Sequence, residues 1–362
     1  MRGEPRGGGR HRTRGARPSI QVAFRVAAGP RLGFGHLVRA IHLAGALGVP
    51  PRVSIRGSET AAETARRLGV SLLPAVPGSV LGRDVALLVL DDPSRLAAEP
   101  WLRAARRAGV RVVSIHDIGL APLASDLAID GSLGARRVDG LGRDAAACRL
   151  GPAFAILAPS LARLRRPPVV ATGRPTIVIG LGGGRHAATG IGIATHLLST
   201  VDRRAMLGAR VMLSLGLDSA GVDARDLPRG IRLIPAATFR TALSRATVAV
   251  VAGGTTLYEA CALGIPVVAV PVVPGQAETI RRFVRAGLAV SPRGGAGVTG
   301  GVGTARGDRA AAVAALALLD DVARQRALSR RGREVIDGQG AARVAAAIGR
   351  LLQVTTKAGT RP

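Results

Sequence analysis

Short apolar runs alternate with longer helical stretches along most of this chain, starting at Ser19. Leu37–Leu47 and Ala61–Leu68, for example, carry apolar residues three and four positions apart, which is the period of an amphipathic helix. Strand–helix–strand units of this kind build a parallel sheet, because each helix returns the chain to the same edge of the sheet. The strands predicted in the first half are Ile20–Phe24, Pro51–Ile55, Val85–Leu90, Val110–Ile115 and Leu127–Ile129.

A second series of the same kind follows Pro159–Pro175, a linker-like segment that contains four prolines. Since 362 residues exceed the size at which a single core usually stops growing, we predict two doubly wound, Rossmann-like α/β domains. The second series has predicted strands at Thr176–Ile179, Arg210–Ser214, Ile231–Ile234, Val248–Val251 and Val267–Val270, then a helical region at Arg309–Leu352 broken near Gly338–Gly340. The predicted boundaries are a disordered leader at 1–18, the first domain at 19–158, a linker at 159–175, the second domain at 176–353 and a tail at 354–362.

The formal charge of +28 raises nucleic acid as a partner, because clustered Lys and Arg neutralise phosphates. The arginines are scattered along the helices, however, and aromatic residues that could stack on bases make up 2% of the chain. Lys357 is the only lysine, so arginine has replaced lysine almost everywhere, as a compositional bias would produce. These observations argue against a nucleic-acid partner.

The sequence shows no sign of export, membrane insertion or metal binding. Its Arg- and Gly-rich leader lacks the apolar core of a signal peptide or a membrane span. Cys148 and Cys261 lie far apart without a second ligand motif, which argues against a disulfide framework and a zinc site. We therefore predict a cytoplasmic protein without stable membrane insertion, metal or cofactor. A Gly-rich insert, Gly294–Gly307, is interpreted as a mobile loop.

The sharpest motif of the first domain is Gly33-Phe34-Gly35-His36-Leu37-Val38-Arg39, which joins the first predicted strand to the first predicted helix. Gly33 and Gly35 let the backbone approach a ligand closely, and a helix start favours an anionic or polar partner. His36 lies at the carboxyl edge of the sheet, where doubly wound folds bind ligands, and imidazole suits proton transfer near neutral pH. The alternative is a histidine that only caps or packs against the helix.

In the second domain, Val250–Glu259 predicts a buried strand, a glycine turn and a helix. Backbone N–H groups of Gly254, Thr255 and Thr256, together with the hydroxyls and the helix dipole, could bind a diphosphate without a metal. One turn further, Glu259 offers a carboxylate suited to the vicinal hydroxyls of a ribose. The alternative is a helix carboxylate that pairs with a nearby arginine.

Other polar residues follow strands at the same two edges. Gly180–Gly184 forms another glycine turn, and Gln276 is equally compatible with a sugar contact and with an ordinary loop position. Asp91-Asp92 and His116-Asp117 lack a third convergent carboxylate, so we interpret them as helix N-caps in preference to metal ligands. No role is assigned to the remaining histidines considered, His42, His186 and His196.

Taken in order, these motifs resemble the family of UDP-sugar hydrolases of pseudaminic acid biosynthesis and the related spore-coat polysaccharide proteins. That family belongs to the glycosyltransferase B superfold, with a family 28-like C-terminal domain. The likeness spans roughly Arg25 to Val290. It rests on the motif around His36 and on the following stretches: His116-Asp117 with Asp126–Asp130, Leu150–Leu157, Gly253–Pro266, and Gln276 followed by Ala286–Ala289.

The resemblance implies two Rossmann-like domains that face each other across a cleft and bind a UDP-sugar there. It implies that His36 helps water attack the anomeric carbon and release UDP, that Gly33 and Gly35 lie on the sugar side, and that Arg39 anchors the first helix. In the second domain it implies diphosphate binding by Gly253, Gly254 and Thr255, ribose binding by Glu259, and a sugar or phosphate contact by Gln276. The free sugar would serve surface polysaccharide or nonulosonic acid synthesis.

Three departures from the family leave the sugar and the reaction open. Ala27 stands where family members usually have an aspartate, and Gly275 replaces an asparagine. The glycine turn that is usually followed by a Ser-Asp pair reads Gly182-Gly183-Gly184-Arg185-His186 here. An inverting glycosyltransferase and a non-catalytic nucleotide-sugar binder therefore remain as alternatives. A transferase with a lipid-linked acceptor should carry an apolar and basic surface on its first domain, for which Ser71–Leu81 is a candidate.

Overall fold

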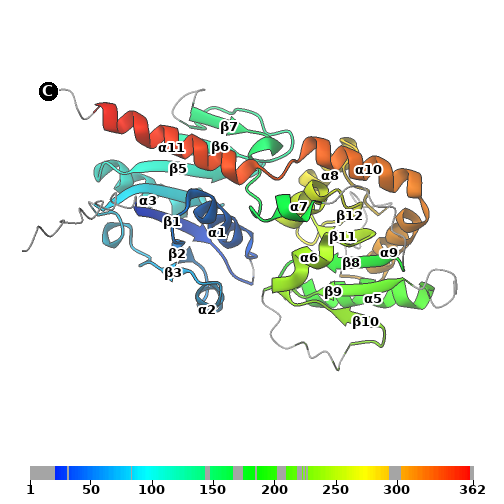
Figure 1. The fold of residues 1–362 in the computed structure, drawn as a ribbon. Coiled ribbons are helices and arrows are strands. Elements are labelled where there is room, and N and C mark those ends of the chain that lie inside the picture. Colours follow the sequence, from blue (N-terminus) through cyan, green and yellow to red (C-terminus); the bar gives the residue numbers. More distant parts are fainter. Residues whose placement is uncertain are drawn as a thin grey trace, which may run out of the picture.

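The structure is a computed structural model, and it contains two α/β domains (Figure 1). The structure describes residues 21–30, 32–82, 84–142, 147–165, 174–183, 186–201, 209–217, 222, 225, 227–292 and 303–358. The predicted leader lies outside this part of the chain, as do half of the predicted linker, most of the Gly-rich insert and the last residues of the predicted tail.

The first domain is built on a seven-stranded sheet in which every pairing is parallel. Its order is β3-β2-β1-β4-β5-β6-β7, so the chain starts in the middle and winds outward in both directions. The strands are β1 (Gln21–Ala27), β2 (Arg52–Arg56), β3 (Ser71–Leu72), β4 (Val85–Asp91), β5 (Arg111–His116), β6 (Leu127–Asp130) and β7 (Cys148–Leu150). All five predicted strands are confirmed, whereas the short edge strands β3 and β7 were not predicted because neither forms an apolar run.

The second domain has a five-stranded parallel sheet of order β10-β9-β8-β11-β12. Its strands are β8 (Thr176–Gly180), β9 (Arg210–Ser214), β10 (Ile231–Leu233), β11 (Val248–Ala252) and β12 (Val267–Val270), which confirms the five predictions. In each sheet the order reverses beside the first strand, at the β1/β4 and the β8/β11 junctions. Doubly wound folds bind ligands at such switch points, outside the carboxyl ends of the strands.

Helices cover both faces of each sheet, which explains why the strands read as nearly continuous apolar runs. The predicted region Arg309–Leu352 forms three helices, with an unpredicted break at Asp321 besides the predicted break before Gly340. The helices are α1 (Gly35–Leu47), α2 (Glu59–Arg67), α3 (Arg95–Arg107), α4 (Leu161–Leu164), α5 (Ala187–Val201), α6 (Phe239–Leu243), α7 (Thr255–Leu263), α8 (Ala277–Arg285), α9 (Ala305–Asp320), α10 (Val322–Val335) and α11 (Gly340–Ala358). Within the described residues, none combines the length and the hydropathy of a membrane-spanning helix.

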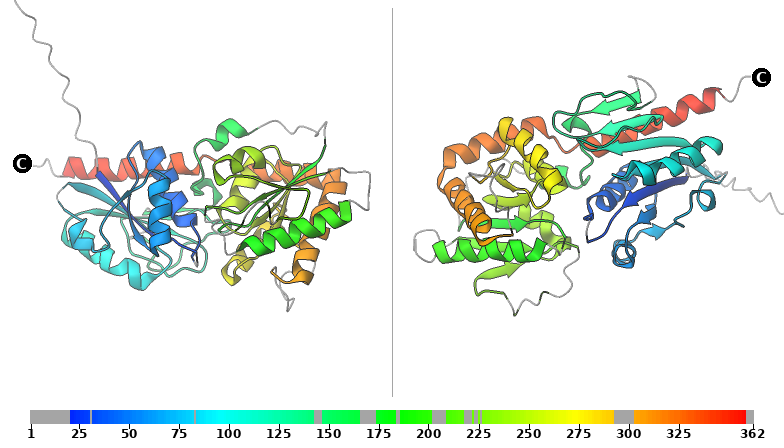
Figure 2. Two further views of the ribbon diagram at one scale, coloured as in Figure 1. Left: turned by 90° about the horizontal axis from the view of Figure 1, so that it is seen from below. Right: turned by 180° about the vertical axis from the view of Figure 1, so that it is seen from behind.

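The last helix, α11, crosses back and lies along the first domain (Figures 1 and 2). Val344 and Ile348 are fully buried in the core that also contains Phe24 of β1 and Leu37 of α1. Gly340 begins the helix so close to the backbone of Ala155 that no side chain would fit between them. Residues 340–353, assigned above to the second domain, therefore complete one face of the first.

Candidate active site between two helix starts

The first turns of α1 and α7 face each other across the domain boundary. A Cβ atom added to Gly35 of α1 would lie 3.8 Å from Oγ1 of Thr255 at the start of α7. A Cβ added to Gly183, in the turn after β8, would lie 3.7 Å from the ring of Phe34. Three turns at the carboxyl edges of the two sheets thus meet here.

The turn before α1 is closed by its own backbone. Gly33 donates its N–H to the carbonyl of Gly29 at 2.7 Å, and the N–H of Gly29 returns a bond to Gly33 at 3.0 Å. Gly33 has a φ of 77°, in the left-handed region where a side chain would be strained. This closed turn fixes the entry to α1 and places the next residues, Gly35 and His36, at the interdomain boundary.

His36 is oriented by a buried carboxylate. Its Nδ1 lies 2.8 Å from Oδ1 of Asp91, the last residue of β4, and the Asp91 side chain is 1% exposed. The His36 side chain keeps 16% of its surface exposed. Because β4 is the direct neighbour of β1 in the sheet, its end falls beside the turn that carries His36.

The carboxylate of Asp91 decides which nitrogen of His36 carries the proton. Nη2 of Arg39 donates to the same Asp91 Oδ1 at 2.6 Å and also lies 3.0 Å from Nδ1 of His36. An ionised carboxylate only accepts, so Nδ1–H donates to Asp91 and shares that oxygen with Arg39. The contact between Arg39 and Nδ1 then joins two donors and is not a hydrogen bond. In the neutral imidazole, this tautomer has its lone pair on Nε2, which can then accept a proton.

Arg39 ties α1 to the ends of two strands. It donates to Asp91 through Nε at 2.7 Å and to Asp117, just after β5, through Nη1 at 2.8 Å. Burial alone would raise the pKa of Asp91, but the charges and hydrogen bonds of Arg39 and His36 more than offset it and hold that pKa well below its ordinary value. Asp91 therefore stays ionised, and Arg39 anchors the helix as the resemblance implies.

The capping interpretation of the two polar pairs is wrong, because none of the four side chains is the N-cap of a helix in the described chain. Asp91 serves His36 and Arg39, while Asp92 pairs with Arg56 of β2 at 2.6 Å and accepts one backbone N–H from Ser94. The N-cap of α3 is Ser94 itself. In the second pair, Asp117 binds Arg39, and His116 is buried against Ser114, 2.7 Å from its Oγ. The described residues contain no cluster of three or more acidic, histidine or cysteine side chains that could hold a metal.

The turn before α7 is held by Gln276. The side-chain oxygen of Gln276 accepts from the N–H of Gly253 at 3.3 Å and of Val272 at 3.0 Å. A Cβ on Gly253 would lie 2.9 Å from side-chain atoms of both Gln276 and Ile280, so a larger residue here would force those side chains to shift. Gln276 thus shapes the turn with its oxygen, and its amide nitrogen is the group left for a sugar or phosphate contact.

The start of α7 offers backbone N–H groups rather than acidic or basic side chains. The N-cap is Gly254, no side chain caps the helix, and Thr255 and Thr256 form its first turn. The first N–H groups of a helix have no partner within it and carry the positive end of the helix dipole. This is the arrangement that a diphosphate needs.

Glu259 lies one turn further along α7 and is buried, with 7% of its side chain exposed. Nε of Arg240, on α6, donates to its Oε1 at 3.0 Å, and Nη2 of Arg240 lies 2.8 Å from Nε2 of His42 on α1. The alternative of a carboxylate paired with an arginine therefore matches the contact made here, while the burial of Glu259 departs from a solvated helix position.

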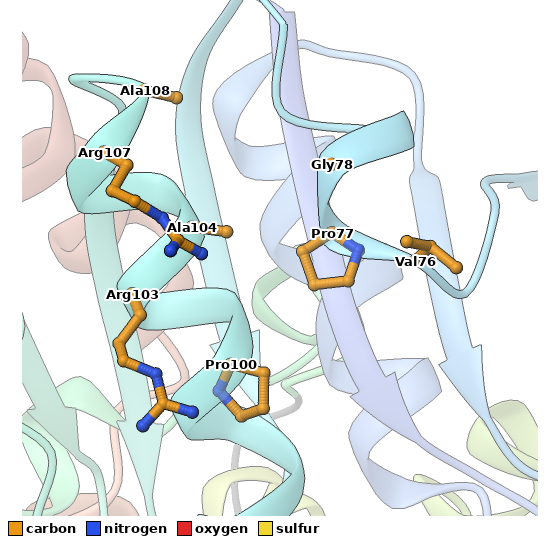
Figure 3. Close-up of a pocket in the computed structure, with 8 residues that line it drawn as sticks. All are labelled: Val76, Pro77, Gly78, Pro100, Arg103, Ala104, Arg107 and Ala108. Atoms are coloured by element: carbon orange, nitrogen blue, oxygen red, sulfur yellow. The ribbon is translucent and has the colours of Figure 1, made fainter.

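A cavity of about 530 Å³ lies on the first domain, between α3 and the 3-10 turn η1 (Pro77–Ser79) (Figure 3). Val76 and Pro77 line one side of it and Arg103 and Arg107 of α3 the other. Val76 belongs to the apolar stretch Ser71–Leu81 and is 61% exposed. None of the residues that line this cavity belongs to the site around His36.

The sequence matches no profile of a known protein family and no curated protein. The fold, in contrast, matches many solved structures. The spinosyn rhamnosyltransferase SpnG, complexed with thymidine diphosphate, superposes with a TM-score of 0.60 at 14% identity, over 92% of this chain and 100% of that one. The calicheamicin glycosyltransferase CalG4 gives 0.59 at 15% identity, over 93% and 99%. MnaA of S. aureus, in a structure with UDP, gives 0.57 at 12% identity, over 92% and 97%.

These likenesses and the two doubly wound sheets define the chain as a protein of the glycosyltransferase B fold. The predicted fold class is thereby confirmed. At these levels of identity, the structural likeness establishes the fold and does not identify the reaction.

Two residues of this site were missed as functional candidates. Asp91 was visible as a polar residue at the end of a predicted strand, and the strand order that places it beside His36 could have identified it. No sequence pattern distinguished Arg240, because it is one of many arginines in the chain and lies on a short helix.

Proposed function

We propose that this protein is a metal-independent enzyme that hydrolyses a UDP-linked amino or deoxy sugar at its anomeric carbon. The observation that carries the proposal is the hydrogen bond of 2.8 Å between His36 and the buried Asp91, at a helix start that faces the first turn of α7. A base held by an ionised carboxylate, opposite a bare helix N-terminus, combines proton transfer with anion binding in one cleft.

In the proposed reaction, Nε2 of His36 takes a proton from water as the water oxygen attacks the anomeric carbon. The bond from that carbon to the β-phosphate oxygen breaks, and its electron pair leaves on UDP, so that the product is the free sugar with inverted configuration. Asp91 keeps the imidazole oriented and stabilises the imidazolium that forms.

The second domain would hold the leaving group. N–H groups of Gly254 and the hydroxyl-bearing Thr255 and Thr256 would bind the diphosphate at the positive end of α7. Glu259 would accept hydrogen bonds from the ribose hydroxyls, and Gln276 would contact the sugar through its amide nitrogen. We propose that the sugar product serves surface polysaccharide or nonulosonic acid synthesis in the cytoplasm.

The test is UDP release in water from a panel of UDP-linked 2-acetamido and 2,4-diacetamido sugars. We expect release from at least one donor by the wild-type protein and none above background by His36→Ala, which should still bind UDP. UDP binding by the wild-type protein with no release from any donor in water would overturn hydrolysis.

A second candidate is an inverting glycosyltransferase in which a sugar or lipid-linked hydroxyl replaces water. One observation favours it: the exposed Val76 lies beside Arg103 and Arg107 on the first domain, an apolar and basic pairing that an anionic lipid surface would accept (Figure 3). UDP release that requires an added hydroxyl acceptor, and that vesicles containing anionic lipid stimulate, would favour the transferase. A protein that binds UDP and releases none under either condition would be a non-catalytic binder.

A further inference from the structure

Arg240 connects the two domains at the proposed nucleotide site. Its Nε donates to Glu259 of α7, and its Nη2 lies 2.8 Å from Nε2 of His42 on α1 of the first domain. Because a guanidinium only donates, Nε2 of His42 must accept, which places the proton of that imidazole on Nδ1. Burial, aided by the charge of Arg240, lowers the pKa of His42 to about 3, so His42 stays neutral and able to accept.

The buried position of His42 is energetically unfavourable, and its packing contacts do not explain why a histidine stands there. Its side chain is buried, and Nδ1 has no hydrogen-bond partner among the described residues. A buried donor without a partner destabilises a protein, so such groups are rare. The hydrogen bond that the other ring nitrogen, Nε2, makes is therefore the feature to explain. The described contact that uses this ring is the one to Arg240.

Glu259 needs such a partner if it is to bind hydroxyls. Burial raises the pKa of its carboxyl group, and the charge and hydrogen bond of Arg240 act in the opposite direction. A carboxylate has lone pairs for about four hydrogen bonds. After one bond from Arg240 to Oε1, the carboxylate still has enough lone pairs to accept from the two hydroxyls of a ribose.

We propose that Arg240 is a positioning residue for the nucleotide site, which aims the carboxylate of Glu259 at the ribose 2′- and 3′-hydroxyls. His42 supports Arg240 from the other domain. The inference rests on the proposed function, in which Glu259 binds the ribose. It adds that a residue of the first domain helps to set the nucleotide affinity of the second.

The other charged groups on the elements packed against α7 lie elsewhere or have other partners. On α10, Arg333 lies against Gly264, which follows the far end of α7. Arg165, which follows α4, donates to the carbonyl of Arg333. The carboxylate of α8, Glu278, pairs with two arginines of its own helix. Strands β11 and β12 carry only apolar residues. Within the described chain, Arg240 is thus the charged group that pairs with Glu259.

The experiment is calorimetric titration of UDP and of 2′,3′-dideoxy-UDP, from pH 5 to pH 8. The variants are Arg240→Met, His42→Leu and His42→Gln, with Arg66→Met as a control that breaks an exposed Arg–Glu pair on α2. We expect the wild type to prefer UDP at every pH. Arg240→Met should bind UDP about tenfold to a hundredfold more weakly and dideoxy-UDP as the wild type does, because only the hydroxyl contacts are lost.

Two further readouts separate positioning from folding. UDP affinity of Arg240→Met should fall more steeply than that of the wild type as the pH falls from 8 to 5, because loss of Arg240 raises the pKa of Glu259 further. His42→Leu should weaken UDP binding to a smaller extent, and His42→Gln, whose side-chain oxygen can accept from Arg240, should restore it. Unchanged binding of dideoxy-UDP shows in each case that the diphosphate site is folded.

The remaining outcomes contradict one proposal or the other. Arg240→Met with an undiminished preference for UDP and a pH profile like that of the wild type would overturn the positioning role and leave the proposed function standing. Equal losses for both ligands would do the same. A wild-type protein that binds both ligands equally, or neither, would overturn ribose binding by Glu259 and with it this part of the proposed function.

Discussion

The two facing helix starts use the same local structure for different chemistry. Each consists of a buried parallel strand, a glycine turn and a helix: β1 leads into α1, and β11 into α7. The start of α1 carries His36 and Arg39, which are bonded to two carboxylates at the ends of neighbouring strands. The start of α7 carries a bare glycine N-cap and the two threonines Thr255 and Thr256.

The same strand–turn–helix backbone can therefore serve proton transfer or anion binding, depending on the side chains that it carries. Titratable groups at the first start fix one imidazole tautomer, as general base catalysis needs. At the second start, small residues leave backbone N–H groups open, as anion binding needs. If the two starts act independently, proton transfer can be lost while nucleotide binding is retained, and nucleotide binding can be lost while proton transfer is retained.

The sharpest test of this separation is His36→Ala. We expect turnover to fall by about 10²–10⁴-fold, because the proton acceptor is gone, while the dissociation constant for UDP stays within about twofold. Steady-state UDP release and calorimetry measure the two effects, with His196→Ala on α5 as the control. A parallel loss of UDP binding would mean that the two starts do not act independently.

Asp91→Asn should lower turnover by about tenfold to a hundredfold, since the amide no longer fixes the Nδ1–H tautomer or stabilises the imidazolium. Asp92→Asn provides a matched control one residue away, because Asp92 pairs with Arg56 and does not touch His36. Equal losses in the two variants, measured as kcat for UDP release, would remove Asp91 from the proposed mechanism.

The same carboxylate makes folding stability depend on pH. The folded pKa of Asp91 lies below its unfolded value, so its stabilising contribution is complete above about pH 4 and is lost as the pH falls through the folded pKa. The difference in Tm between the wild type and Asp91→Asn should therefore be largest near neutrality and should shrink below pH 4. A difference that grows with acidification would contradict the assigned direction of the shift.

Gly253→Ala tests the second start through its packing. The new methyl group would press on Gln276 and Ile280, and we expect the free energy of unfolding to fall by about 1–3 kcal/mol. Gly275→Ala meets no atom within 4 Å and serves as the control. Denaturant titration measures the loss. Full stability of Gly253→Ala would show that the turn before α7 is looser than its contacts indicate.

Thr255→Val should have the smallest effect. It removes one hydroxyl from the proposed diphosphate site and leaves the backbone donors, so UDP should bind about fivefold more weakly with kcat nearly unchanged. Thr195→Val, which removes an exposed hydroxyl bonded within α5, is the matched control. A larger loss in kcat than in affinity would assign Thr255 to the reaction itself.

The sequence was sufficient for the architecture because every long strand is an apolar run between helical stretches. It also identified both glycine turns and His36, since each follows a predicted strand. The strand order decides which strand ends meet, and the sequence does not contain that order as a local pattern. Asp91 was therefore interpreted as a cap, although β4 places it beside His36.

Contacts between segments that lie far apart in the sequence were the least predictable part. Gln276 was considered for substrate, yet its oxygen bonds the backbone of Gly253, because the fold brings two loops together there. Arg240 and His42 lie far apart in sequence and meet only when both domains are assembled. Local periodicity contains no information about such a pair.

The position of α11 has a consequence for how this protein is made. A ribosome completes β1 and α1 early, but Val344 and Ile348, which cover them, are translated only after the whole second domain. During synthesis the nascent first domain must therefore keep an apolar face uncovered. A fragment that stops before Gly340 would leave that face uncovered, so the first domain is a poor candidate for separate expression. The second domain, in contrast, can fold before the first domain is complete.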